Sequence, residues 1–337
     1  METSNTRFNA DIAFAAMQVK RMLDGPFGQG VRMRPFVLSV KNSIQENEGL
    51  INISVNNYLK KMKNKNSKLY LRHCFKQAVE YANLQNNASI ETVPLIQFYS
   101  LLNLSKVFII IKNGIHNISL STIESMFSSH GAASKNVNDV SISNRGTFIE
   151  LTKIQNAMSN NSYSLSQLYK RLPDLYEYLP MVFSDCKTDF VPVQYCQDYM
   201  YETGRIKPSL YFHWLVVDKT FFEQNLNNKN LYTIRDTVGT KVVFSKVNRN
   251  ESLNDIIHFD CNGKLFLDAS ISEDDELLSI YLIFLKYSSL VRYKPKNWYE
   301  KINSNELVII EKMLRTMFFK FWAYIARRLT DRYEILI

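Results

Sequence analysis

An apolar segment near the end of the chain, residues 277–290, constrains the fold more than any other feature of the sequence. Ser272 and the acidic residues 273–276 precede it. Serine is a favoured helix N-cap, and negative charge is stabilised near a helix N-terminus. Pro295 disfavours a helical conformation of the residue before it, so the helix should end at about Arg292. The segment therefore predicts a buried helix that brings two or three cations and an aromatic ring to one turn.

Several other segments repeat apolar residues every three or four positions, which is typical of amphipathic helices, and the region 181–270 alternates as strands do. We therefore predict an α+β fold, with a mainly helical core from both chain ends and an antiparallel β insertion. The predicted helices cover residues 8–23, 69–84, 92–112, 121–127, 164–172 and 305–332, and the clearest strands cover residues 211–217, 241–244 and 264–267.

Turn signals divide the chain further. Residues 136–150 are predicted to be extended and rich in turns, with Arg145 and Gly146 forming one of these turns. The organisation that we predict is an N-terminal helical extension over residues 1–60 followed by one domain over residues 61–337. Within that domain, we expect a helical part over residues 61–180, a β-rich part over 181–270 and C-terminal helices over 271–337.

Composition excludes several common kinds of site. The chain has 337 residues, of which only ten are glycine, and it contains neither phosphate-binding glycine motif. The signatures of serine hydrolases and zinc proteases, G-x-S-x-G and H-E-x-x-H, are absent as well. No two of the four cysteines have C-x-x-C spacing, so we predict no metal site and no cofactor. The cysteines are Cys74, Cys186, Cys196 and Cys261.

No segment predicts a membrane or secretion signal. The longest aliphatic patch, residues 107–111, is too short to span a bilayer, and the N-terminus is polar. Reduced thiols suit a cytoplasmic location, which we expect for this protein.

The formal net charge of +9 permits contact with an acidic partner such as nucleic acid. The densest basic run is interrupted by asparagines, which suits an exposed loop or a helix end. We call this run the lysine patch; it is either a solvated loop or a surface that contacts phosphates. Its members are Lys60, Lys61, Lys63, Lys65 and Lys68.

Three segments, in this order, resemble the bacterial YaaC-like family. They are residues 72–106, then His130-Gly131 with Asn144-Arg145-Gly146-Thr147-Phe148, and finally residues 281–298. The resemblance runs from about residue 68 to 328, and the stretch after His130-Gly131 is less basic here than is typical of the family. It implies a bacterial cytoplasmic protein of α+β character and no particular reaction.

Known nuclease patterns fit poorly. A HEPN-type ribonuclease carries an arginine and a histidine four to six residues apart on one helix, and no histidine of this chain has an arginine at that distance before it. Asp174 with residues 185–187 imitates the acid and acid-x-Lys of a metal-dependent nuclease, a pattern that also arises by chance. Cys74 follows His73, but neighbouring helix residues point about 100° apart, so we interpret the pair as incidental.

One group of residues predicts a pocket for an anionic ligand. A histidine before glycine either caps a helix end or exposes its imidazole beside a closely approaching backbone. Arginine supplies a planar fork for phosphate or carboxylate, although the same residues also suit a structural turn. If His130, Arg145 and Arg292 meet in space, a shared anion pocket is the leading idea. The predicted pocket residues are His130, Gly131, Arg145, Arg292, Lys294 and Trp298.

Three hypotheses for the function stay open. The first is a protein without obvious catalysis that binds an anionic partner such as nucleic acid, as a component of a stress or phage-defence module. The second is an enzyme acting on a phosphate-containing substrate through His130, Arg145 and Arg292. The third is a scaffold or homo-oligomer whose aromatic helices contact a protein partner. Whether the protein is an enzyme is therefore undecided at this point.

Overall fold

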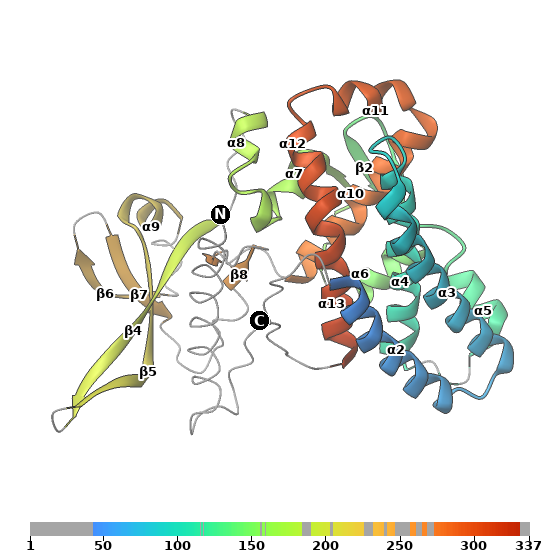
Figure 1. Ribbon diagram of the computed structural model, residues 1–337. Helices are drawn as coiled ribbons and strands as arrows, with labels where there is room; N and C mark the ends of the chain where they lie inside the picture. The colour runs from blue at the N-terminus through green and yellow to red at the C-terminus, as the bar shows by residue number, and fades with distance from the viewer. Residues whose placement is uncertain are drawn as a thin grey trace. The chain divides into compact units, whose positions relative to one another are not determined.

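Figure 1 shows the structure of the chain, a computed structural model. The residues described are 43–114, 116, 118–155, 157–158, 160–183, 190–202, 205–225, 232–238, 241–246, 257–260, 265–267 and 273–330. They divide into two compact units. One, which we call the helical unit, holds Ser39–Thr188 and Ser272–Arg332. The described residues of the other, the β unit, lie within Asp189–Ile271.

Helix α4 (Val93–Lys112) lies at the centre of the helical unit and contacts α3 (Lys65–Leu84), α10 (Glu273–Tyr293) and α13 (Phe318–Thr330) (Figure 1). By length and composition α4 could cross a membrane, but 72% of its most hydrophobic window is buried inside the structure. A helix that is apolar all round belongs in a core, and α4 is a core helix here. The other helices of this unit are α2 (Ser43–Lys61), α5 (Leu120–Met126), α6 (Thr147–Gln155), α7 (Leu165–Lys170), α8 (Leu179–Val182), α11 (Pro295–Ile302) and α12 (Leu307–Lys312).

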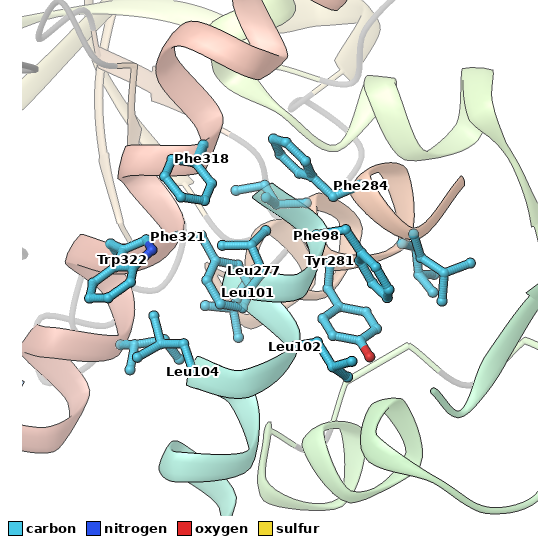
Figure 2. Packing of buried hydrophobic residues seen from close by; sticks show 14 of the residues in the cluster. Phe98, Leu101, Leu102, Leu104, Leu277, Tyr281, Phe284, Phe318, Phe321 and Trp322 are labelled. Atoms are coloured by element: carbon cyan, nitrogen blue, oxygen red, sulfur yellow. The ribbon is translucent and has the colours of Figure 1, made fainter. Parts of the chain in front are cut away.

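Aromatic rings fill the space between these central helices (Figure 2). Phe98 of α4 meets Tyr281 of α10 edge-on, with ring centroids 5.7 Å apart. Phe284 of α10 meets Phe318 of α13 at 6.2 Å in a tilted arrangement. Such offset geometries are the favourable ones for aromatic pairs. Because the rings come from both parts of the chain, neither part can bury its apolar residues alone.

A charged cluster is also buried in this core. The ammonium of Lys320 lies 2.7 Å from a carboxylate oxygen of Asp174 and 2.9 Å from one of Glu276. Tyr324 donates a hydrogen bond of 2.5 Å to the same oxygen of Glu276. Burial alone would lower the pKa of Lys320, but the two carboxylates raise that pKa well above its ordinary value. Asp174 is therefore part of a buried ion pair, and residues 185–187 of the nuclease-like pattern lie outside the described residues.

The β unit contains a six-stranded sheet in the order β6-β7-β5-β4-β9-β8. Its described pairings are antiparallel, and β4 and β5 form a long hairpin in which Gln194 pairs with Val216 and Glu202 with Arg205. The strands are β4 (Val191–Glu202), β5 (Arg205–Asp218), β6 (Tyr232–Val238), β7 (Lys241–Lys246), β8 (Ile257–Phe259) and β9 (Leu265–Leu267), and a short helix, α9 (Lys219–Asn225), follows β5.

A second, smaller sheet belongs to the helical unit. Strands β1 (Ala132–Ser134), β2 (Asp139–Ile142) and β3 (Ser162–Ser164) pair antiparallel in that order. The fully buried ammonium of Lys286 in α10 donates to the Ser134 hydroxyl at 2.6 Å and to the carbonyls of Asn136 and Asp139. These contacts use the three N–H donors of a lysine and hold the β1–β2 hairpin against α10.

The predicted fold class is confirmed, with a mainly helical core from both chain ends and an antiparallel β insertion. The helices predicted at 69–84, 92–112, 121–127 and 164–172 correspond to α3, α4, α5 and α7, and the three predicted strands to parts of β5, β7 and β9. The buried helix α10 ends at Tyr293, one residue later than expected. The predicted helix at 8–23 and the predicted cap Ser272 lie outside the described residues.

The predicted C-terminal helix, 305–332, is present but changes its winding in the middle. Between α12 and α13, residues Met313–Met317 form a π-helical turn. The side-chain amide of Gln97 in α4 donates a hydrogen bond of 2.8 Å to the carbonyl of Leu314 in this turn. A π turn disturbs the regular pattern of helical hydrogen bonds, and Gln97 satisfies a carbonyl at that point.

One structural prediction is wrong. Residues 147–150 were expected to be extended, but Thr147–Gln155 form helix α6. Thr147, Phe148 and Ile149 are residue types common in strands, which favours the wrong assignment. Phe148 and Leu151, three positions apart, are both fully buried, so a helical face decides the conformation. The extended conformation predicted from residue 136 onward is present in β2. The other two strands of the small sheet and helices α2 and α11 were not predicted. The division of the chain at residue 60 stays a prediction, and α2 contributes Ile51 and Val55 to the core.

Candidate functional site

His130 follows α5 and lies just before β1, with its imidazole against two rings of α4. The imidazole meets Phe98 edge-on at a centroid distance of 5.3 Å and Tyr99 at 6.5 Å. The carbonyl of His130 accepts hydrogen bonds from the Tyr281 hydroxyl at 3.1 Å and from the Phe148 amide at 3.0 Å. The backbone that carries the imidazole is therefore held by α10 on one side and by the start of α6 on the other.

Two glycines allow the backbone to pass this closely. Gly131 has a φ of +81° and Gly146 a φ of +112°, and both angles disfavour any residue with a side chain. A Cβ on Gly131 would lie 2.6 Å from the Phe148 amide nitrogen, and a Cβ on Gly146 would lie 2.6 Å from the Gly131 nitrogen. The segments 129–131 and 146–148 are thus in direct backbone contact, which fixes the position of His130.

Arg292, in the last turn of α10, reaches the same place from the other part of the chain. Its guanidinium donates a hydrogen bond of 2.8 Å to the Tyr99 hydroxyl and lies 6.0 Å from the centre of that ring. Tyr99 therefore contacts both Arg292 and His130.

Lys106 lies on α4 two turns after Tyr99, so both residues occupy the same side of that helix. Burial lowers the pKa of Lys106, an effect that the Cys74 thiol opposes. Burial is also the main cause that lowers the pKa of His130, followed by the charges of Lys106 and Arg292. We call Lys106, His130 and Arg292 the His130 cluster.

The His130 cluster is electropositive and suited to an anion. Among the described residues, no carboxylate forms an ion pair with any of its three members. An anionic group bound there would interact with two cations and would raise the pKa of the imidazole. In the free protein, the lowered pKa keeps the imidazole neutral at pH 7, which is the form that a general base needs.

Of the other predicted pocket residues, Gly131 lies beside His130, whereas the side chains of Arg145, Lys294 and Trp298 make no described contact with this cluster. Arg145 is exposed, and only its carbonyl takes part, accepting a hydrogen bond of 3.0 Å from the Ser129 hydroxyl. Lys294 lies near Lys286, whose pKa is lowered to about 8 by burial and then by the charge of Lys294. Trp298 is buried, donates to the carbonyl of Ile90 at 3.3 Å and contacts the ring of Tyr287.

The lysine patch lies where α2 ends and α3 begins. Lys60, Lys61, Lys63 and Lys65 are exposed and Lys68 is half-buried. None of the five forms an ion pair with a carboxylate in the part of the chain that the structure describes. The patch continues along α3 to Arg72 and Lys76, because residues three and four apart share one face of a helix. These side chains form a basic face about 16 Å long from Lys65 to Lys76.

Lys106 and Tyr99 were missed by the sequence analysis. A single lysine inside the apolar helix α4 is the signal that could have indicated Lys106, since a cation among buried positions needs a reason. Cys74 and His73, interpreted as an incidental pair, differ in environment: the thiol is buried and the imidazole exposed. Within the described residues, no group of three or more His, Cys, Asp or Glu side chains could hold a metal ion.

These features define a mainly helical α+β protein whose helical unit, built from two parts of the chain, presents a half-buried histidine near a lysine and an arginine. The chain belongs to the YaaC-like protein family, whose model matches residues 42–329. This match confirms the resemblance and includes α2, which lies before the expected start at about residue 68. A search of curated proteins and a search of solved structures found no match.

Proposed function

We propose that this YaaC-like protein binds the phosphate groups of a nucleic acid at the His130 cluster. The observation that carries the proposal is the convergence of Arg292 and His130 on Tyr99, with Lys106 on the same side of α4 and no ion-paired carboxylate among the described residues. The half-buried ammonium of Lys106 and the exposed guanidinium of Arg292 thus lack a carboxylate that would balance their charge within the described residues. A phosphate supplies the balancing negative charge.

The residue types suit an anion with several oxygens, such as a phosphate or a carboxylate. Arginine presents a planar fork that can donate two parallel hydrogen bonds to phosphate oxygens, and lysine adds a point charge. The hydrogen bond from Arg292 to Tyr99 leaves other guanidinium donors for a ligand. The lysine patch and the basic face of α3 favour phosphate within a nucleic acid, because a polyanion can contact more cations than a small ion can.

One observation favours the second candidate function, an enzyme acting on a phosphate-containing substrate. The imidazole of His130 is neutral at pH 7 and lies near two cations that could stabilise charge developing on a phosphate. The binding proposal requires only the charges, whereas the enzyme also requires turnover. The two are separated by scoring binding and cleavage in the same experiment.

The test is titration of the purified protein with labelled RNA, single-stranded DNA and duplex DNA at low and physiological salt. We expect binding that weakens steeply with salt and is lost or strongly reduced in Arg292→Gln and Lys106→Gln. Arg315→Gln is the matched control, because that arginine is exposed and lies on the π-helical turn. No binding at low salt, or equal binding by all variants, would contradict the proposal.

Cleavage of any of the three nucleic acids that disappears in His130→Asn would establish the enzyme. The other expectations also stay proposals. They are a bacterial cytoplasmic location, a role in a stress or phage-defence module, and a protein partner or homo-oligomer.

A further inference from the structure

Four planar side chains from three helices follow one another beside the His130 cluster. Tyr81 of α3 stacks on Tyr99 of α4, with centroids 5.7 Å apart and planes 30° apart. The guanidinium of Arg292 lies 6.0 Å from the centre of Tyr99 and 4.7 Å from the centre of Tyr293. These four planar groups thus form a row, which we call the aromatic row. Its order is Tyr81, Tyr99, Arg292 and Tyr293.

The row runs from the protein to solvent. Tyr81 and Tyr99 are half-buried, whereas Arg292 is exposed and 67% of Tyr293 is exposed. The Arg292 guanidinium lies over one face of the Tyr293 ring, and no other ring or cation contact involves Tyr293 among the described residues. With 67% of the residue exposed, the face away from the guanidinium is accessible to a ligand. Exposure alone does not distinguish Tyr293, since Tyr299 is 64% exposed as well. What distinguishes Tyr293 is its contact with an arginine that we assign to phosphate binding.

An exposed aromatic face beside a cation is the arrangement with which proteins hold single-stranded nucleic acid. Successive bases stack on aromatic rings while cations contact the backbone, and the arrangement is tolerant of sequence because every base has a flat face. A duplex cannot use it in the same way, because its base faces are already stacked on their neighbours. A small anion would use Arg292 but would gain nothing from Tyr293.

We propose that the ligand of the His130 cluster is single-stranded nucleic acid, and that an unpaired base stacks on the open face of Tyr293. This inference rests on the proposed phosphate binding and adds the kind of ligand. Arg292 then has two contacts at once, since its guanidinium supports the Tyr293 ring and its remaining donors reach the phosphate. Tyr99 holds that guanidinium in place through its hydroxyl.

The experiment compares three labelled probes of about 12 nucleotides, a length within the range of known single-strand sites. The probes are a mixed-sequence single strand, an abasic strand of the same length and the corresponding duplex. The abasic strand keeps every phosphate and lacks every base, so it reports phosphate binding without stacking. The variants are Tyr293→Ala and Tyr293→Phe, with Tyr299→Ala as the control, because Tyr299 is 64% exposed on the neighbouring helix α11.

We expect Tyr293→Ala to weaken binding of the single strand about tenfold and to leave binding of the abasic strand unchanged. Tyr293→Phe should bind the single strand as tightly as the unaltered protein does, because the variant keeps the ring. Tyr299→Ala should also bind all three probes as the unaltered protein does. The duplex should bind the unaltered protein more weakly than the single strand does.

Two results would overturn the inference. If the abasic strand binds as tightly as the single strand and both depend on Arg292, phosphate binding stands and base stacking fails. If the duplex binds most tightly, the ligand is not single-stranded. Absence of binding by all three probes would instead remove the proposed function itself, and circular dichroism of each variant shows whether the fold is intact.

Discussion

The phenol of Tyr281 donates a hydrogen bond of 3.1 Å to the carbonyl of His130, which ties the candidate site to the buried helix α10. The same ring contacts Phe98 edge-on at 5.7 Å and stacks on Phe148 at 5.7 Å. Tyr281 is fully buried, and burial raises the pKa of its hydroxyl, so the phenol remains a donor. The imidazole is therefore positioned by core packing as well as by its own loop.

Tyr281→Phe tests this connection. The ring remains and no cavity forms, so we expect the free energy of unfolding to fall by about 1 kcal/mol, the usual contribution of one hydrogen bond. We also expect a changed imidazole signal of His130 in a two-dimensional NMR spectrum, because its backbone loses one of two restraints. Tyr163→Phe removes a phenol that accepts from the Asn160 amide and serves as the control. An unchanged His130 signal would show that the hydrogen bond does not position the imidazole.

Gly146→Ala should be among the most damaging single-methyl additions in the helical unit. The new Cβ would lie 2.3 Å from the Ser129 hydroxyl and 2.6 Å from the Gly131 nitrogen, at a φ of +112°. We expect a loss of about 3 kcal/mol or more in the free energy of unfolding, from strain and displaced backbone. In Gly114→Ala, where φ is +62° and no atom lies within 4 Å of the new Cβ, the loss should be about 1 kcal/mol. Equal losses measured by urea denaturation would contradict the close backbone contact.

The protonation of His130 should make both stability and binding depend on pH. Its pKa in the folded protein is lowered from 6.5, so below that pH the unfolded chain binds more protons than the folded chain does. The free energy of unfolding should therefore fall as the pH decreases below about 6.5, and His130→Asn should reduce this dependence. The affinity for phosphate should instead increase as the pH decreases, since a bound anion favours the charged imidazole. An NMR titration of His130 with and without an oligonucleotide measures both shifts.

Much of the fold could be predicted because the relevant patterns are local. Helices α3, α4, α7 and α10 repeat apolar residues at helical spacing and carry recognisable ends, such as the capping box of Ser164 and Gln167 at α7. Helix α6 was missed because its first residues favour strands and only tertiary burial of Phe148 and Leu151 decides for a helix.

The candidate site was predictable only in part, because it depends on contacts between distant segments. Residue type and spacing indicated His130 and Arg292 separately, but their meeting at Tyr99 is a property of the folded chain. Arg292 and Trp298 are only six positions apart in the sequence, yet Trp298 is buried and Arg292 is exposed. A linear motif does not reveal on which side of a helix corner each side chain lies.

The lysine patch makes a separate prediction about salt dependence. Lys63→Gln with Lys65→Gln should leave the free energy of unfolding within about 0.5 kcal/mol, because both side chains are exposed. If the patch binds phosphates, the slope of log affinity against log salt should decrease by about 1 for each lysine–phosphate pair that the substitutions remove. Replacing Lys153, which is exposed and lies 2.7 Å from Glu150, is the control for charge alone. An unchanged slope in the double variant would mean that the patch is a solvated surface.

Lys320→Met should destabilise the protein strongly. The substitution removes the ammonium that lies 2.7 Å from Asp174 and 2.9 Å from Glu276, two carboxylates inside the core. Breaking a buried pair from one side typically costs about 3–5 kcal/mol. Adding Asp174→Asn and Glu276→Gln to Lys320→Met should recover part of that loss, because neutral amides need no counter-charge. Failure of the triple variant to regain any stability in urea denaturation would argue that the ion pairs are not the cause.

The two-part construction of the helical unit also affects how the chain is made. During synthesis, Ser39–Thr188 leave the ribosome before the second part of the helical unit, because the ribosome must translate Asp189–Ile271 before α10 can emerge. Throughout that interval the apolar helix α4 lacks α10 and α13, its later partners. A nascent chain with such a surface uncovered is exposed to aggregation, which is the hazard that chaperones reduce. The delay set by the β unit is therefore a period in which production of this protein depends on the cell's capacity to shield an unfinished core.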